Sequence, residues 1–183
     1  MIGTHLVVVD MQRVFADADS AWATPGFASA SAGIRRLLPA FAGRTVFTRF
    51  VAPDEPVGAW IPYYRDWPDQ LRPEGDPVWD ITPELAADDA PVVSAPTFGK
   101  WGPDLAAATA GSDRLVVAGV STDCCVLSTA LAAADAGRFV VVPADACAGL
   151  SDADHRRALD AMALYGPLIT ISTVDAVLAM MGA

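Results

Sequence analysis

Six short runs of β-branched and other apolar residues constrain the fold of this chain most strongly. Each run is continuous rather than alternating, which is typical of strands buried on both faces of a parallel sheet. Segments with helical spacing of apolar residues lie between the runs, so strand and helix alternate along the chain. The apolar runs fall at residues 6–10, 45–48, 91–94, 114–119, 138–143 and 168–172.

The helical segments complete an α/β pattern. Right-handed crossovers would place them on both faces of the sheet. We therefore predict a single domain over residues 1–183, with an α/β fold: a three-layer α/β/α sandwich around a six-stranded parallel sheet of order 3-2-1-4-5-6. The expected helices cover residues 29–42, 101–110, 122–136, 152–165 and 173–181.

Composition and charge exclude several classes of protein. With 53% hydrophobic and 19% charged residues the chain is not a disordered one. The net charge of −10 argues against nucleic acid or an anionic membrane as a partner, because phosphate binding needs a basic face. The first residues lack the pattern of a signal peptide, and three cysteines are too few for a disulfide framework. We expect a cytoplasmic protein that binds a small molecule.

One segment, around residues 52–90, interrupts the alternation of strands and helices. The stretch 52–103 holds ten of the fourteen prolines and four of the five tryptophans. It is too long for a plain connection between a strand and a helix. Two interpretations stay open: an ordered surface insertion or half of a subunit contact in a homodimer or homotetramer, and a rigid aromatic wall of a pocket. Candidate pocket residues are Gln12, Phe15, Arg49, Trp60 and Trp101, although a polar residue such as Gln12 is equally ordinary at the start of a helix.

Chemically useful side chains follow the strands at the expected centre of the sheet. Asp10 ends the first strand, and Gly119-Val-Ser-Thr-Asp-Cys-Cys-Val126 follows the fourth. In open α/β sheets, ligands bind beyond the carboxyl ends of the strands, where the strand order reverses. If the first and fourth strands are neighbours, Asp10 faces the cysteine pair Cys124 and Cys125 across that crevice.

The cysteine pair would lie in the first turn of a helix capped by Thr122 or Asp123. Free amide groups and the positive end of the helix dipole lower the pKa of a thiol there and supply donors for an oxyanion. Neighbouring helix residues point about 100° apart, so only one of the two cysteines is expected to face the crevice. Either one is a candidate nucleophile on this argument.

Both motifs resemble those of the isochorismatase-like cysteine hydrolases, a family that includes nicotinamidases and N-carbamoylsarcosine amidase. The motifs are Leu6-Val-Val-Val-Asp-Met-Gln-Arg-Val-Phe15 and the block that ends at Val126. The resemblance covers nearly the whole chain. It implies that Cys125 is the nucleophile and Asp10 the general base. It also implies a cis peptide bond between Val120 and Ser121, and an oxyanion hole formed by the amides of Ser121 and Cys125.

The family's catalytic lysine has no direct counterpart. Its usual place falls near Ala95, whereas Lys100, the only lysine of the chain, lies about five residues later. A compact ammonium can tune a neighbouring carboxylate and thiol, so we assign the family role to Lys100. The alternative is a solvated lysine on a loop, in which case Arg49 is the next cation to consider.

The sequence after the second strand, the two histidines and the absence of a glycine-rich motif argue against a metal or a nucleotide cofactor. Many nicotinamidases carry an Asp-x-His metal site after the second strand, where this chain has Thr48-Arg-Phe-Val-Ala-Pro53. His5 and His155 are expected on the surface, and Cys147 in the packed interior. We therefore expect no metal, no cofactor and no cysteine–histidine dyad. There is also no Gly-x-Gly-x-x-Gly motif after the first strand.

Together these features predict a metal-independent cysteine hydrolase that cleaves a C–N bond of a small amide or ureide through a thioester. One alternative is a vinyl-ether hydrolase of the isochorismatase type, whose members typically do not use a cysteine nucleophile. The other is a catalytically silent family member that serves in binding or assembly, which the displaced lysine favours.

Overall fold

A parallel sheet forms the centre of the computed structural model, which describes residues 3–86 and 89–182. Six strands run in the order β3-β2-β1-β4-β5-β7, and the two-residue strand β6 pairs with β4. The predicted order is confirmed, with β7 as the sixth expected strand. Strand β6 was not predicted because two residues are too few to give a pattern. The strands are β1 (Gly3–Val9), β2 (Thr45–Phe50), β3 (Val92–Ala95), β4 (Ser112–Val120), β5 (Phe139–Pro143), β6 (Cys147–Ala148) and β7 (Ile169–Ser172).

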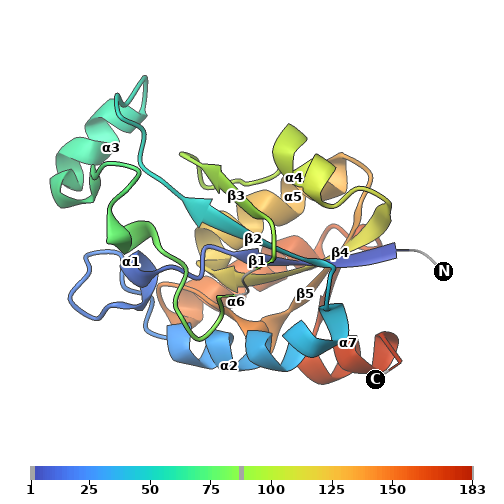
Figure 1. Ribbon diagram of the computed structural model, residues 1–183. Helices are drawn as coiled ribbons and strands as arrows, with labels where there is room; N and C mark the ends of the chain where they lie inside the picture. The colour runs from blue at the N-terminus through green and yellow to red at the C-terminus, as the bar shows by residue number, and fades with distance from the viewer. Residues whose placement is uncertain (1–2, 87–88, 183) are drawn as a thin grey trace.

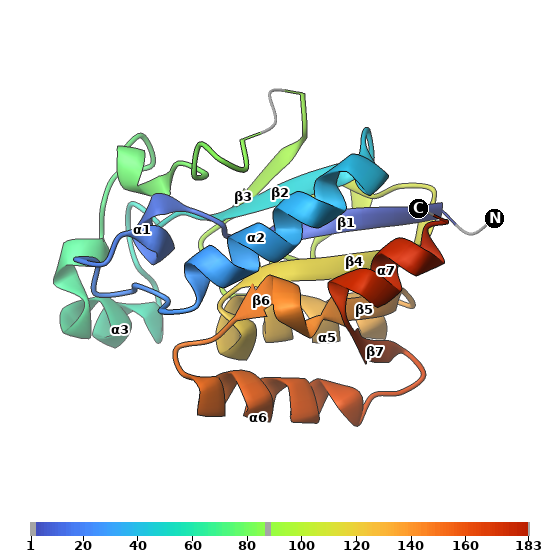
Figure 2. The same cartoon turned by 90° about the horizontal axis from the view of Figure 1, so that it is seen from below.

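Helices cover both faces of this sheet and complete the predicted three layers (Figure 1). Helices α2 and α7 pack together on one face, and α5 and α6 pack together on the other (Figure 2). None of the helices in the described ranges is long and apolar enough to cross a membrane. The helices are α1 (Arg13–Ala16), α2 (Phe27–Leu37), α3 (Trp60–Asp66), α4 (Pro103–Ala108), α5 (Leu127–Asp135), α6 (Asp152–Ala163) and α7 (Val174–Met180).

Strands β1 and β4 form the most deeply buried part of the core. Residues 6–9 and 115–118 are completely shielded from solvent, as expected for central strands of a parallel sheet. Near the carboxyl end of this pair, Gly119 lies beside Val9 with a φ of 130°. A Cβ atom at Gly119 would lie 2.1 Å from the carbonyl oxygen of Val9. Only glycine at position 119 therefore lets strands β1 and β4 approach each other this closely, just before Asp10 and Val120.

The Pro- and Trp-rich segment folds as an ordered excursion beyond the carboxyl ends of the strands. It contains α3 and two 3-10 turns, Pro68–Gln70 and Pro77–Trp79. Figure 1 shows α3 standing away from the sheet, on the side to which β1 and β2 point. The segment is fastened by Trp79, which is fully buried and donates its indole N–H to the carbonyl of Pro73.

Candidate active site

Asp10 lies at the carboxyl end of β1 with no exposed surface. Its φ of 51° is in the left-handed region, which aspartate adopts more readily than most residues. The Thr48 hydroxyl donates a hydrogen bond of 2.6 Å to Oδ1 of Asp10, and the Asp10 amide donates to the carbonyl of Thr48. The turn of the backbone and the bonds to β2 together aim this carboxylate across the end of the sheet.

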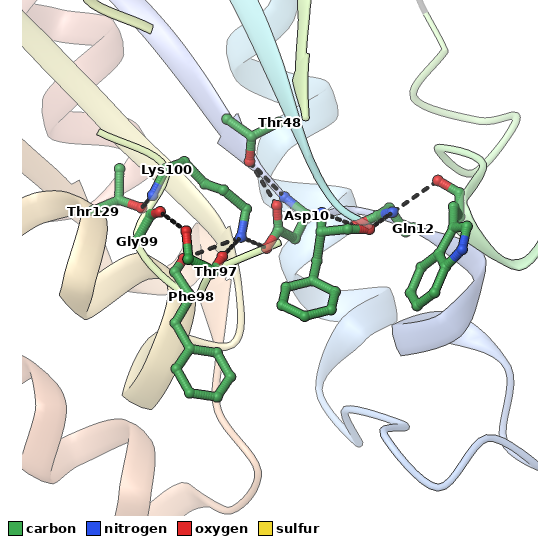
Figure 3. Close-up of polar contacts among 10 residues, drawn as sticks. Asp10, Gln12, Thr48, Thr97, Phe98, Gly99, Lys100 and Thr129 are labelled. Atoms are coloured by element: carbon green, nitrogen blue, oxygen red, sulfur yellow. Dashed lines mark hydrogen bonds and ion pairs between the residues drawn. The ribbon is translucent and has the colours of Figure 1, made fainter. Parts of the chain in front are cut away.

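Lys100 reaches the other oxygen of the same carboxylate. Its Nζ lies 2.9 Å from Oδ2 of Asp10, and neither side chain has exposed surface. The ammonium also donates hydrogen bonds of 2.5 and 3.1 Å to the carbonyls of Thr97 and Phe98. Figure 3 shows the side chain extended from the loop after β3 toward Asp10. Lys100 is therefore not a solvated loop residue.

The backbone at Lys100 is fastened as firmly as its side chain. Its amide donates a 3.0 Å hydrogen bond to the hydroxyl of Thr129 on α5. The loop that carries the lysine is thus tied to the helix that follows the cysteines. The tie holds the loop in the place from which the Lys100 side chain reaches the carboxylate of Asp10.

Cys125 lies in a tight turn between β4 and α5. The peptide bond between Val120 and Ser121 is cis, and residues Thr122–Val126 form a π-helical turn that leads into α5. The predicted helix over 122–136 is thus divided in two. The amides of Cys124 and Val126 both donate to the carbonyl of Ser121. Cys125 is 3% exposed, yet its side chain forms part of a pocket wall.

The pKa of the Cys125 thiol is raised well above its ordinary value, contrary to the expectation from the helix start. Burial raises it most, and the charge of Asp10 and a hydrogen bond with Asp10 add to the rise, while the charge of Lys100 opposes it. A local argument from the helix dipole misses this, because burial and a facing carboxylate both disfavour a second negative charge. The Cys125 thiol therefore keeps its proton beside the carboxylate of Asp10.

The other two cysteines lie in different surroundings. Cys124 is half-buried, and its thiol lies 3.8 Å from Oδ2 of Asp123. Burial and the charge of Asp123 raise its pKa to about 11. Cys147 is buried and its thiol faces the carbonyl of Val117. The position of Cys147 in the packed interior agrees with the sequence-based expectation.

An apolar pocket of about 250 Å³ opens beside Cys125. Half of its lining residues are aromatic, and they come from four separate segments. The indole of Trp22 lies nearly parallel to Phe15, with ring centres 6.2 Å apart. The lining residues are Phe15, Ala21, Trp22, Thr24, Phe50, Tyr63, Trp67, Phe98, Ser121, Cys124, Cys125 and Leu150.

Of the five candidate pocket residues, only Phe15 lines this pocket. Trp60 packs behind the wall, with its ring 6.3 Å from Phe50 and 5.2 Å from Phe98. Arg49 points elsewhere and donates to the hydroxyl of Ser94, because Thr48 and Phe50 on either side of it in β2 face the site. Trp101 lies under the guanidinium of Arg138, 5.5 Å from its carbon. The placement of these three residues corrects the expectation.

Gln12 is a brace and does not contact the pocket. Its amide nitrogen donates to the carbonyls of Phe50 and Trp79, and its amide oxygen accepts from the backbone N–H of Phe50 (Figure 3). The residue is fully buried. Gln12 thus ties the start of α1 to both β2 and the aromatic excursion, and it acts on the loop rather than on substrate.

Sequence reasoning missed several residues that the structure brings to the site. Trp22 is the one tryptophan outside residues 52–103, and nothing in the neighbouring sequence predicted a place for it in the pocket wall. Tyr63 and Trp67 belong to that segment, but no periodicity shows which rings face inward. Thr48 ends the second apolar run of the sequence, and no sequence pattern predicts its hydrogen bond to Asp10.

The two histidines are held by hydrogen bonds instead of lying free on the surface. Nδ1 of His5 lies 2.6 Å from the Ser112 hydroxyl, and Nδ1 of His155 lies 2.8 Å from the hydroxyl of Thr122. Both rings are half-buried, and burial lowers the pKa of both. Neither lines the pocket, so neither is placed to act on a cysteine thiol there.

The residues at the end of β2 do not suit the metal site of many nicotinamidases. Thr48 is bonded to Asp10 and Arg49 to Ser94, and none of residues 48–53 is a histidine. Within ranges 3–86 and 89–182, no three histidine, cysteine, aspartate or glutamate side chains gather as metal ligands would. These residues therefore do not fit the metal, and no step is assigned to one.

Known proteins place this geometry in a family. A curated relative, isochorismatase domain-containing protein 2 of Xenopus laevis, is 36% identical over 93 residues; the match spans 49% of this chain and 45% of that protein. A cysteine hydrolase from Pseudomonas syringae pv. phaseolicola 1448A superposes with a TM-score of 0.88 at 23% identity, covering 98% of this chain and 92% of that one. The pyrazinamidase of Pyrococcus horikoshii, solved in complex with zinc, gives a TM-score of 0.75 at 26% identity, covering 93% of this chain and 98% of that one. Residues 4–173 match the isochorismatase domain, and the chain belongs to the isochorismatase-like family.

Proposed function

We propose that this protein is a metal-independent cysteine hydrolase that cleaves a C–N bond of a small amide or ureide through a thioester. The observation that carries the proposal is the meeting of Asp10, Lys100 and Cys125 beside one apolar pocket. A carboxylate that can accept the proton of a facing thiol is the arrangement that nucleophilic catalysis needs. Membership of a family that includes a cysteine hydrolase of the same fold supports it.

The first step moves one proton and forms one bond. As the Cys125 sulfur attacks the substrate carbonyl carbon, its proton passes to Asp10. The Lys100 ammonium favours the negative sulfur, since its charge lowers the pKa of this thiol. The carbonyl oxygen becomes an oxyanion, which the amides of Ser121 and Cys125 would bind. Removing one such donor typically costs about 10²–10³ in rate.

The second step breaks the C–N bond. The oxyanion collapses, protonated Asp10 gives its proton to the leaving nitrogen, and an amine or ammonia departs from a thioester on Cys125. A water molecule then loses a proton to Asp10 and attacks the thioester. The acid product leaves, and the sulfur takes the proton back from Asp10. The net reaction consumes one water for each amide cleaved.

Substitution of each cysteine separates this proposal from a silent binding protein. Ammonia release is measured across small amides, carbamoyl compounds and nicotinamide for the unaltered protein and for Cys125→Ala and Cys124→Ala. We expect Cys125→Ala to abolish turnover and Cys124→Ala to retain it. The opposite result would move the nucleophile to the other sulfur, and turnover that survives both changes would end the proposal.

A further inference from the structure

Among the described residues 3–86 and 89–182, no charged side chain lines the pocket beside Cys125. Its lining is aromatic and aliphatic, and the polar groups in it are few. One of them, the Ser121 hydroxyl, already donates to Oδ1 of Asp123. The pocket of about 250 Å³ is also smaller than the roughly 300–1,000 Å³ that is common for drug-sized ligands.

Lys100, whose charge acts on the Cys125 thiol, has no free donor for a substrate. Three groups surround the Lys100 ammonium within hydrogen-bonding distance: Oδ2 of Asp10 and the carbonyls of Thr97 and Phe98. An ammonium has three N–H donors, so this set uses all of them. Arg49, the other cation considered for the site, is bound to Ser94 outside the pocket.

Two rings of the pocket wall, those of Tyr63 and Trp22, meet at an angle of 44°. Tyr63 and Trp22 have ring centres 6.0 Å apart, and Tyr63 also lies against Phe98. The pKa of the Tyr63 phenol is raised, first by burial and then by Tyr64 and both adjacent cysteines. The phenol therefore stays neutral near the sulfurs, where it offers a hydrogen bond but no charge.

From these walls we propose that the pocket selects amides whose body beyond the reacting carbonyl is small, uncharged and apolar, and that it rejects amides bearing a carboxylate. The proposal rests on the function proposed above and names its substrate class. A carboxylate in this pocket would lose its water and gain no cation, which is costly. A flat or branched hydrocarbon group would instead bury its surface against the rings.

The test compares amides of similar size that differ in charge. kcat/KM is measured with benzamide, isocaproamide and succinamate; the last two have closely similar shapes, and only succinamate carries a carboxylate. We expect isocaproamide and benzamide to exceed succinamate by at least about 100-fold, because a site without a partner rejects a buried charge strongly. Equal rates, or a preference for succinamate, would overturn the proposal.

A designed cation gives a second, independent measurement. Trp67 lies on the pocket wall and is 37% exposed. We expect Trp67→Arg to raise the ratio of succinamate to isocaproamide turnover at least about tenfold, because a guanidinium pairs well with a carboxylate. Leu71→Arg is the matched control: it adds the same charge to the same excursion at a residue that is 40% exposed and does not line the pocket. An equal gain in Leu71→Arg, or none in a folded Trp67→Arg, would count against the proposal.

The two proposals fail in different ways. If only carboxylate-bearing amides are hydrolysed, and Cys125→Ala abolishes that turnover, the hydrolase function stands and the selectivity proposal is wrong. If no amide or carbamoyl compound is hydrolysed by the unaltered protein, the hydrolase function itself is wrong.

Discussion

The Nζ atom of Lys100 lies 2.9 Å from Oδ2 of Asp10, and both side chains are sealed from solvent. Two charges in such a place are costly to bring from water, so a pair of this kind contributes little net stability. Each partner is nevertheless essential to the other, because an unpaired charge there would be far more costly. This relationship makes the pair better explained by chemistry than by folding.

Replacing Lys100 alone should both destabilise the protein and stop turnover. We expect Lys100→Met to lower the free energy of unfolding by about 3–5 kcal/mol, since it leaves the Asp10 carboxylate buried without a countercharge. The double variant Asp10→Asn/Lys100→Met should regain much of that loss but remain inactive. Urea unfolding and ammonia release measure the two effects. A single variant as stable as the unaltered protein would show that the pair is not buried in solution.

The raised pKa of the Cys125 thiol predicts slow alkylation at neutral pH. The thiolate fraction below the pKa rises with pH, so labelling by iodoacetamide should accelerate about tenfold for each pH unit between pH 7 and pH 9. Labelling is followed at each cysteine by peptide mass spectrometry, with Cys124 as the half-buried comparison. Rapid labelling of Cys125 that does not change over this range would instead indicate a standing thiolate.

The brace made by Gln12 predicts a change that reaches the pocket without touching substrate. Gln12→Leu removes three hydrogen bonds and leaves the buried backbone groups of Phe50 and Trp79 without partners. We expect a loss of about 2–4 kcal/mol in the free energy of unfolding and a higher KM. Gln70→Leu is the control, because the side-chain oxygen of this buried glutamine has no hydrogen-bond partner among the described residues. Equal losses in the two variants would contradict the brace.

The buried thiol of Cys147 predicts a loss of stability in alkaline solution. Burial raises its pKa from 9.0 to about 12. Because the pKa is higher in the folded state, the thiol keeps its proton to higher pH there than in the unfolded chain. The contribution of the buried thiol to the free energy of unfolding is therefore complete below pH 9 and is lost as the pH rises toward 12. Between about pH 8 and about pH 10, the unaltered protein should lose about 1 kcal/mol more than Cys147→Ala. Urea unfolding at both pH values checks this, and equal losses would rule out the contribution of the thiol.

The architecture could be predicted from sequence because it follows from long, repeated patterns. Continuous apolar runs identified every main strand, and the positions of Asp10 and Cys125 after neighbouring strands followed from the strand order. Lys100 was assigned through the resemblance and the scarcity of lysine. Its loop is held by a hydrogen bond to Thr129, a contact between residues 29 apart in the chain that no local pattern encodes.

Properties set by the whole surroundings of a side chain were not predictable. The pKa of Cys125 depends on burial and on Asp10, which outweigh the helix start that the sequence displays. The outward direction of Arg49 follows from alternation along β2, and could have been inferred once Thr48 was placed against Asp10. The inward rings of the excursion depend on how it folds back over the strands, which its prolines and aromatic residues do not specify.

The aromatic excursion has a consequence for how proteins of this type can diverge. The segment around α3, which carries Tyr63 and Trp67, projects from the sheet (Figure 1). Asp10 and Cys125, in contrast, follow the two innermost strands, β1 and β4. For the proposed hydrolase, part of the pocket wall is thus carried by a segment separate from the two reactive residues. Evolution, or a protein engineer, could change the substrate preference by exchanging that projecting segment without altering the reactive residues.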